Sequence, residues 1–146
     1  MPIRLPARRP GFTLIELALV LVIVGLASLV GIRQLQHFLD RIATRDAARA
    51  AGAFIARARD EAIALHTAVS VRVDTAAAAL ELRARGPAFA RAALGAVHGV
   101  TLSTTRDSIT FDARGLGYGA ANLTLVARRG RAADTVTVSR LGRVRY

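Results

Sequence analysis

The sequence lacks residues on which several kinds of chemistry depend. Its 146 residues, a length that suits one domain with one core, include no cysteine, which excludes disulfides, cysteine–zinc sites and thiol catalysis. It has no lysine either: all 21 basic residues are arginines, against 10 acidic residues, and the formal net charge is +11. Such an excess favours contact with phosphates, anionic lipid or an acidic partner. A general arginine bias of the genome would produce the same composition.

Groups suited to catalysis or metal binding are also scarce. His37, His66 and His98 stand apart, without a partner four residues away, and we expect no bound metal and no cofactor. The serines lie in no motif typical of a catalytic triad. Residues 115–119 contain three glycines but lack the Lys-Ser/Thr end of a phosphate loop, so we interpret them as a turn between strands. The sequence therefore predicts a protein that is not an enzyme.

Charge is missing from one long segment near the N-terminus. No charged residue occurs from Leu17 to Ile32, and the apolar run that begins at Phe12 comprises 21 residues. At about 1.5 Å per residue, a helix of this length spans a hydrocarbon core of about 30 Å. Glu16 lies near its start, and because a carboxylate is costly inside a membrane, we expect it to have a partner. An ordinary signal anchor with an acid near the interface would also fit the pattern.

The string Gly11-Phe12-Thr13-Leu14-Ile15-Glu16, after a short leader with three arginines and three prolines, resembles the type III signal peptide of type IV pilins and type II secretion pseudopilins. The resemblance implies that a prepilin peptidase cuts between Gly11 and Phe12 and methylates the new N-terminal phenylalanine. It also implies that Glu16 pairs with the amine of a neighbouring subunit in a hetero-oligomeric filament of pseudopilins or minor pilins. Losing the leader would leave 18 − 10 = +8 on the mature chain.

The domain organisation follows from this resemblance and from the charge pattern. We expect a cleaved leader over residues 1–11, a transmembrane and filament-core helix over 12–32, and a periplasmic globular domain over 33–146. Arginines in the leader favour an N-terminus in the cytoplasm. The chain would then be a single-pass protein of a bacterial inner membrane.

The helical pattern continues beyond the apolar run. Leu35, Phe38, Leu39 and Ile42 follow the i, i+3, i+4, i+7 spacing of one helix face. Six further residues extend this stripe with a small drift: Ala47, Ala50, Phe54, Ala58, Ala62 and Leu65. We expect one helix from about Phe12 to Leu65, its second part on a globular core, with Gly52 at a place of close packing.

From Ala68 the period of the apolar residues changes to two. Six short runs of this kind are typical of half-buried strands: 69–73, 80–83, 100–103, 108–111, 122–126 and 135–139. Turn signals separate them, among them Arg128-Arg129-Gly130-Arg131. Residues 86–97 fit a loop, a short helix or a poor strand. The expected fold class is α+β, a long N-terminal helix packed on an antiparallel sheet domain that is β-rich over 68–146.

The order of the last strands resembles the GspH/FimT family of minor pseudopilins and minor pilins, in which a long helix carries a two-sheet globular domain. The segments that carry this resemblance are residues 111–115, 122–125, 136–139 and 142–145. It implies an H-type minor pseudopilin of a type II secretion system, a structural subunit of the periplasmic pseudopilus, which we favour. The alternative is a FimT-like minor pilin of a type IV pilus that binds DNA during uptake. The missing cysteines argue against a major pilin closed by a disulfide.

The C-terminal residues Gly142, Arg143 and Arg145 match the Gly-Arg-x-Arg pattern of the DNA-contacting motif of FimT-like minor pilins. In a strand the two arginines share one face, which would leave Val144 and Tyr146 toward the core. Arg128, Arg129 and Arg131, in the expected hairpin turn, would enlarge the patch. The alternative is a solvated edge strand, whose charges discourage edge-to-edge pairing.

Overall fold

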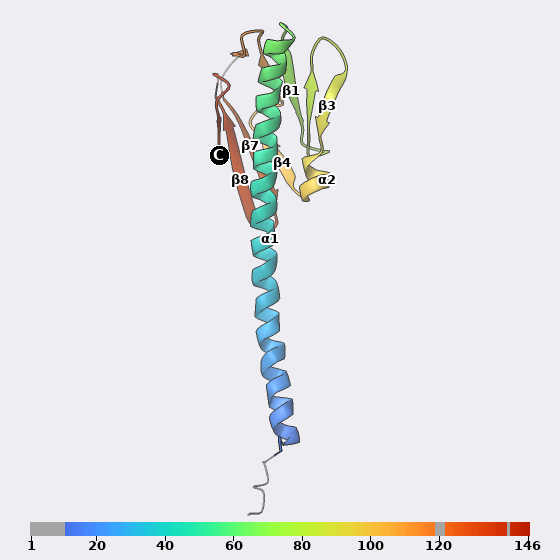
Figure 1. Cartoon of the computed structure of the whole chain (residues 1–146), viewed down its shortest axis with the longest axis vertical. Helices are drawn as coiled ribbons and strands as arrows, with labels where there is room; N and C mark the ends of the chain where they lie inside the picture. The colour runs from blue at the N-terminus through green and yellow to red at the C-terminus, as the bar shows by residue number, and fades with distance from the viewer. Residues whose placement is uncertain (1–10, 119–121, 140) are drawn as a thin grey trace, which may run out of the picture. The chain divides into compact units, whose positions relative to one another are not determined.

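The structure, a computed structural model, describes residues 11–118, 122–139 and 141–146, and the chain divides into two units between Gln36 and His37. Helix α1 (Leu14–Ala64) supplies the first unit and continues into the second (Figure 1). The second unit adds these elements: β1 (Val69–Asp74), β2 (Ala79–Arg83), β3 (Ala88–Ala92), α2 (Leu94–His98), β4 (Thr101–Thr104), β5 (Ser108–Phe111), β6 (Gly117–Tyr118), β7 (Leu123–Arg129), β8 (Ala132–Val138) and β9 (Val144–Arg145).

The strands form two antiparallel sheets. The first sheet has the order β3-β2-β1-β5-β6 and the second sheet the order β4-β7-β8-β9. Each sheet is built around a hairpin of neighbours in sequence, β1–β2 in the first and β7–β8 in the second. The expected α+β class is confirmed, and the stretch 86–97 resolves into strand β3 followed by the short helix α2.

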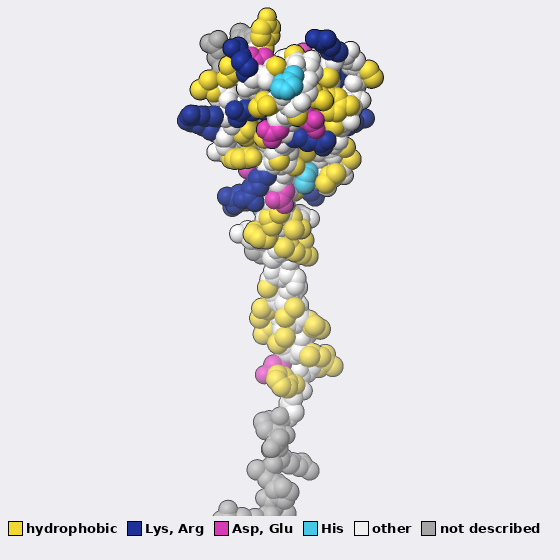
Figure 2. Space-filling view, turned by 45° about the horizontal axis from the view of Figure 1, so that its top comes forward, with side chains coloured by type: hydrophobic (Ala, Val, Ile, Leu, Met, Phe, Trp, Pro, Cys, Tyr) yellow, Lys and Arg dark blue, Asp and Glu magenta, His cyan; other side chains and the backbone are white. Residues whose placement is uncertain are grey.

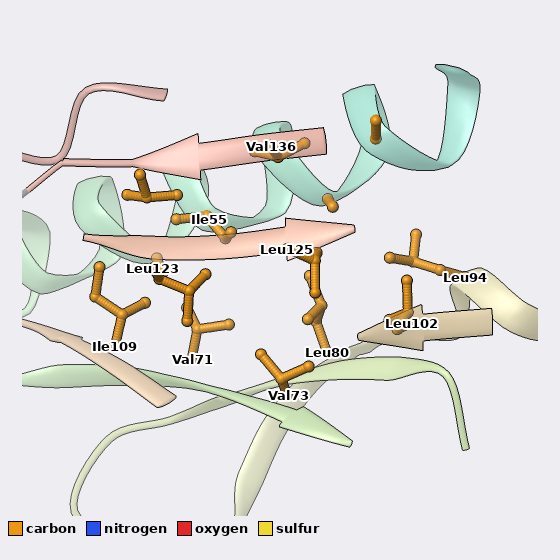
Figure 3. Packing of buried hydrophobic residues seen from close by; sticks show 14 of the residues in the cluster. Ile55, Val71, Val73, Leu80, Leu94, Leu102, Ile109, Leu123, Leu125 and Val136 are labelled. Atoms are coloured by element: carbon orange, nitrogen blue, oxygen red, sulfur yellow. The ribbon is translucent and has the colours of Figure 1, made fainter. Parts of the chain in front are cut away.

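The core of the globular unit lies where one face of α1 meets both sheets. Figure 3 shows Ile55 of α1 with Val71 and Leu80 of the first sheet and Leu123 and Leu125 of the second. All five side chains are buried. Burial of this kind is the main favourable contribution to folding, at roughly 25 cal/mol per Å² of apolar surface.

The buried face of α1 agrees only in part with the stripe expected from the sequence, since Ala47, Ala58 and Ala62 are buried as expected but other members are not. Ile55 is fully buried, whereas Phe54 is half-buried and Leu65 is exposed. The stripe enters the globular unit with Phe38, Leu39 and Ile42, and all three are exposed as well. The face that packs on the sheets is made of small residues around one large one: Ala47, Ala48, Ala51, Ile55, Ala58 and Ala62. Small alanines let the sheets approach the helix closely. The hydrophobicity of the residues alone does not indicate which face of the helix is buried.

The C-terminus of α1 is closed by backbone hydrogen bonds. At its C-terminus His66 adopts a positive φ of 47°, the Thr67 N–H donates to Ala62 O over 3.3 Å, and the His66 N–H donates to Ile63 O over 3.3 Å. This is the pattern of a Schellman motif, in which glycine is the usual residue at the left-handed position. His66 therefore has a structural place at the helix end.

The hairpin between β7 and β8 is tighter than expected. Arg128 pairs with Ala133 and Arg129 with Ala132, so both arginines belong to β7 and the expectation that they lie in the turn is wrong. The turn consists of Gly130 and Arg131, and Gly130 has a φ of +55°. A two-residue hairpin turn of the II′ kind needs a positive φ at its first central residue, and glycine satisfies this without strain.

Candidate functional site

The start of α1 is organised by Thr13 and Glu16. The backbone N–H of Thr13 donates to the Glu16 carboxylate over 3.3 Å, and the backbone N–H of Glu16 donates to the Thr13 hydroxyl over 3.3 Å. This reciprocal arrangement is a capping box, which satisfies two amides that a helix start leaves without partners. Glu16 therefore has a partner within its own chain at the place where the sequence predicts a partner in a neighbouring subunit.

Thr13 is a residue that the sequence interpretation missed. The signal was present, because Thr-x-x-Glu directly before an apolar run is the usual sequence pattern of a capping box. Gly11 and Phe12 precede the helix, and the Phe12 side chain is 84% exposed. A Cβ added to Gly11 meets no atom within 4 Å. The fold thus gives no packing reason for a glycine at this position.

The first part of α1 is apolar around its whole circumference. Hydrophobic side chains occupy much of its visible face, with one acidic side chain near the start (Figure 2). Within the described residues, α1 is the helix that is long and apolar enough to cross a membrane. The Ser28 hydroxyl donates to Val24 O over 2.7 Å, so the polar group in mid-run is satisfied inside the helix.

The C-terminal arginines lie on the solvent side of the second sheet. Arg145 pairs with Thr137, and Val144 pairs with Val138. Val138 is buried and Val144 packs on the core, so Arg145 points away from it. Arg143 is exposed too. Arg128 is on the same outer face, because it alternates with the buried Ala127 and Leu125 of β7.

The other two arginines of the expected patch lie elsewhere. Arg129 is on the opposite face of β7 from Arg128: its Nε lies 3.0 Å from Asp40 Oδ1, and its Nη1 donates to His98 O over 2.9 Å. Arg129 links α1, β7 and α2, so its guanidinium group already has partners within the fold. Arg131 is at the hairpin tip, about 20 Å along β8 from the position opposite Arg145 at about 3.4 Å per residue. The structure thus places Arg128 and Arg145 on the outer face of the second sheet, Arg129 on its inner face and Arg131 at the hairpin tip. Arg143, just before β9, is exposed.

Tyr146 also departs from the expectation that it faces the core. Its side chain is 67% exposed, and its ring lies over Gly52 of α1, where an added Cβ would come within 2.5 Å of the hydroxyl oxygen. The chain ends just past the short strand β9, so the ring rests on the helix from outside. The expectation of close packing at Gly52 is confirmed.

Gly142 has a structural role of its own. It has a φ of +71°, and an added Cβ would lie 3.0 Å from Arg59 Cδ. Gly115, with a φ of +74°, sits equally close to the same side chain, and its carbonyl accepts a hydrogen bond of 3.1 Å from Arg59 Nε. Arg59 of α1 therefore passes between two left-handed glycines, one following β5 and one before β9.

Among the carboxyl groups of the described residues, Asp112 in the loop after β5 has a clearly lowered pKa. Asp112 Oδ1 accepts hydrogen bonds of 2.9 Å from the backbone N–H groups of Leu116 and Arg114, and its Oδ2 lies 3.2 Å from Arg114 Nη2. The Leu116 amide first, and then Arg114, lower the pKa of Asp112 below its usual value, since both favour the ionised form. The turn expected over residues 115–119 is confirmed only in part, because Gly115 lies in the turn after β5 whereas Gly117 and Tyr118 form strand β6. Gly119 lies outside the described residues.

No cluster resembling a metal site occurs in the part of the chain that the structure describes: no three His, Asp or Glu residues are placed to hold an ion. The architecture instead defines a class. A long helix with an apolar first part, followed by two antiparallel sheets packed on its second part, is the plan of a pilin-like subunit.

The comparisons identify the family within that class. The family model described as "Type II transport protein GspH" matches residues 47–142, more than half of the chain, and that of the "Prokaryotic N-terminal methylation motif" matches residues 6–32. The chain belongs to the GspH family. No curated protein matches the sequence.

Solved structures show the same fold at low sequence identity. The type IV minor pilin FimU of Pseudomonas aeruginosa is 20% identical, with a TM-score of 0.60, over 74% of this chain and 90% of FimU. The minor pseudopilin EpsH from the type 2 secretion system of Vibrio cholerae is 16% identical, with a TM-score of 0.53, over 70% of this chain and 94% of EpsH. Both share the pilin-like architecture.

Proposed function

We propose that the chain is the H-type subunit of a type II secretion pseudopilus, a structural protein that works by assembly. The observation that carries this proposal is the GspH match over the globular unit, joined to a methylation motif at the start of the apolar helix. In this function the first unit anchors the subunit in the inner membrane before assembly, and the globular unit stands in the periplasm. Other pseudopilins are its partners in the filament.

Processing between Gly11 and Phe12 is the first step of this function. A prepilin peptidase cuts after Gly11 and methylates the amine of Phe12. Both residues are in the exposed segment before α1, where a peptidase has access to the backbone. Because the fold has open space around Gly11, a bulky residue there is expected to stop cleavage without disturbing the folded chain.

The test is mass spectrometry of the native N-terminus in cells that contain the peptidase. We expect a chain that begins at methylated Phe12, and for Gly11→Val a chain that keeps the leader. Gly86→Val is the matched control, since Gly86 also has open space around it and lies in the globular unit. A wild-type chain that still begins at Met1 would refute the processing step.

Assembly then depends on Glu16, and the capping box permits a sharp test of its charge. Glu16→Gln keeps a residue that serves in a capping box but removes the negative charge. Thr13→Ala weakens the cap but keeps the charge. If Glu16 pairs with the amine of a neighbour, cross-linking to other pseudopilins falls for Glu16→Gln and persists for Thr13→Ala. The reverse result would mean that Glu16 serves only the helix start.

A second candidate function is that of a minor pilin that binds DNA, favoured by the fold shared with FimU and by the exposed Arg128, Arg143 and Arg145. Arg128 and Arg145 are two strands and four residues apart across the second sheet, about 16 Å at ordinary strand spacings. Such a patch contacts phosphates and carries no sequence readout. Gene neighbours distinguish the two functions: a secretion ATPase and other pseudopilins, or pilus and competence genes.

A further inference from the structure

A separate group of arginines surrounds a hollow of about 610 Å³ in the globular unit. One wall is the second part of α1, and the other is the β7–β8 turn with the start of β8. The lining residues are Phe38, Arg41, Ile42, Thr44, Arg45, Arg131, Ala132, Ala133 and Asp134. This hollow is distinct from the outer face of the second sheet that carries Arg128 and Arg145.

The charge in the hollow is unbalanced. Arg41, Arg45 and Arg131 line it together with one carboxylate, Asp134, whose Oδ1 accepts the Thr135 N–H over 2.8 Å. Across the described residues, the ion pairs engage Arg49, Arg57, Arg83, Arg114 and Arg129, and none engages the three arginines of the hollow. Three guanidinium groups against one acid favour an anionic occupant, and guanidinium matches phosphate geometry with paired hydrogen bonds.

The hollow also has an apolar component. Phe38 and Ile42 line it and remain 59% and 42% exposed. A combination of arginines with exposed aromatic and aliphatic side chains is typical of surfaces that bind the headgroup and acyl boundary of a bilayer. A nucleic-acid backbone would use the arginines but leave Phe38 and Ile42 without a function.

The position of Phe38 in the chain brings the hollow close to the apolar run. Phe38 is six residues beyond Ile32, the last residue of that run. Even a fully extended chain covers no more than about 22 Å with six residues. The hollow therefore begins near the end of the membrane anchor whatever the arrangement of the two units.

We propose that this hollow binds the headgroup of an anionic phospholipid while the subunit is anchored in the membrane. The guanidinium groups of Arg41, Arg45 and Arg131 take the phosphate, and Phe38 and Ile42 contact the glycerol and the first methylene groups. The inference rests on the membrane anchoring proposed above and concerns the subunit before it enters a filament. Entry into the filament would then require the lipid to be released.

The test uses the full chain in uncharged detergent micelles, with lipid adducts measured by native mass spectrometry. The probes are phosphatidylglycerol and phosphatidylcholine with the same acyl chains. Each basic side chain near an anionic surface strengthens binding roughly fivefold, so an excess of two positive charges predicts about a 30-fold preference for phosphatidylglycerol. We expect the triple variant Arg41→Gln/Arg45→Gln/Arg131→Gln to lose this preference.

A matched triple variant, Arg85→Gln/Arg91→Gln/Arg106→Gln, removes the same charge from exposed positions outside the hollow and should keep the preference. A second pair of variants leaves every arginine in place: Ala132→Glu puts a carboxylate on the side of β8 that faces α1, the same side as Asp134, and should abolish the preference, whereas Ala132→Gln should retain it. Equal binding of the two lipids by the wild type, or equal loss in both triple variants, would overturn the proposal. The proposal would also be overturned if the variants at Arg41, Arg45 and Arg131 lost binding to duplex DNA but kept their preference for phosphatidylglycerol. Failure of this test leaves N-terminal processing, and with it the proposed function, unaffected.

Discussion

Two neighbouring arginines, Arg128 and Arg129, offer a test of which basic residues serve the fold and which serve the surface. They lie next to each other in β7 but on opposite faces of the second sheet. Arg129 contacts Asp40 and the carbonyl of His98, whereas Arg128 is exposed beside Thr101 of β4. Replacing each one with alanine removes the same charge from almost the same place. Any difference between the two variants therefore reports contacts and not net charge.

The expected magnitude follows from the exposure of the contacts of Arg129. Its side chain is 43% exposed and that of Asp40 is 21% exposed, so solvent screens the pair only in part. Exposed ion pairs contribute about 0.2–1 kcal/mol, and hydrogen bonds that involve a charged group about 1.5–3 kcal/mol. We therefore expect Arg129→Ala to lower the free energy of unfolding by about 1–2 kcal/mol. For Arg128→Ala we expect a change within about 0.5 kcal/mol.

The assay is urea unfolding followed by far-ultraviolet circular dichroism. With a slope of about 2 kcal/mol per molar urea, the loss in Arg129→Ala moves the midpoint down by about 0.5–1 M. A double-mutant cycle with Asp40→Ala isolates the ion pair. Each single change should cost more stability in the wild-type chain than it costs when the other residue is already alanine. Equal midpoints for Arg128→Ala and Arg129→Ala would refute the assignment of Arg129 to the fold.

Three further predictions concern the globular unit. A chain from Arg33 to Tyr146 should be a soluble folded monomer with mixed α and β circular dichroism; aggregation would contradict the proposed boundary. At neutral pH, Asp112→Asn should be less stable than the wild type, because the ionised carboxyl group stabilises the folded chain. This difference should shrink as the pH falls from 3.8, the ordinary pKa of the carboxyl group, through its lower pKa in the folded chain. A difference that stays constant with pH would refute the role of the ionised form. Arg143→Ala/Arg145→Ala should weaken any binding to duplex DNA and reduce its salt slope by about 2, measured by anisotropy at several salt concentrations; an unchanged slope would exclude both as phosphate contacts.

Much of the fold is predictable because local sequence and tertiary packing agree. The uncharged run from Leu17 to Ile32 predicts a helix by its length, the strands are predicted by their period of two, and the structure follows both. The buried face of α1 was harder to predict. In a stretch rich in alanine, Phe54 attracts attention as the largest apolar residue, yet the sheets pack against the alanine face centred on Ile55. Which face of the helix is buried depends on how closely the sheets approach it. The residue pattern of the helix alone gives no information on that distance.

The candidate sites were predictable to different degrees. Gly11, Phe12 and Glu16 lie in one continuous string, so a sequence motif is enough to single them out. The surface on which each arginine lies could not be predicted without the strand boundaries and their pairing. A hairpin turn placed at 128–131 assigns all four residues to one loop. The observed register with Ala132 and Ala133 instead puts Arg128 and Arg129 on opposite faces. The arginines of the hollow come from segments about 90 residues apart, from Arg41 to Arg131, and only the tertiary fold brings them together.

The Gly-Arg-x-Arg pattern at residues 142–145 combines two independent requirements. Gly142 is needed because Arg59 packs against it and because its φ is positive, and both conditions hold whether or not DNA is bound. A match at this glycine therefore carries no weight for nucleic-acid binding. Arg143 and Arg145 are different, since both are exposed and their side chains make no hydrogen bond or ion pair among the described residues. Any argument for a pilus function over secretion must rest on these two side chains and on Arg128, whose surface the fold leaves open to solvent.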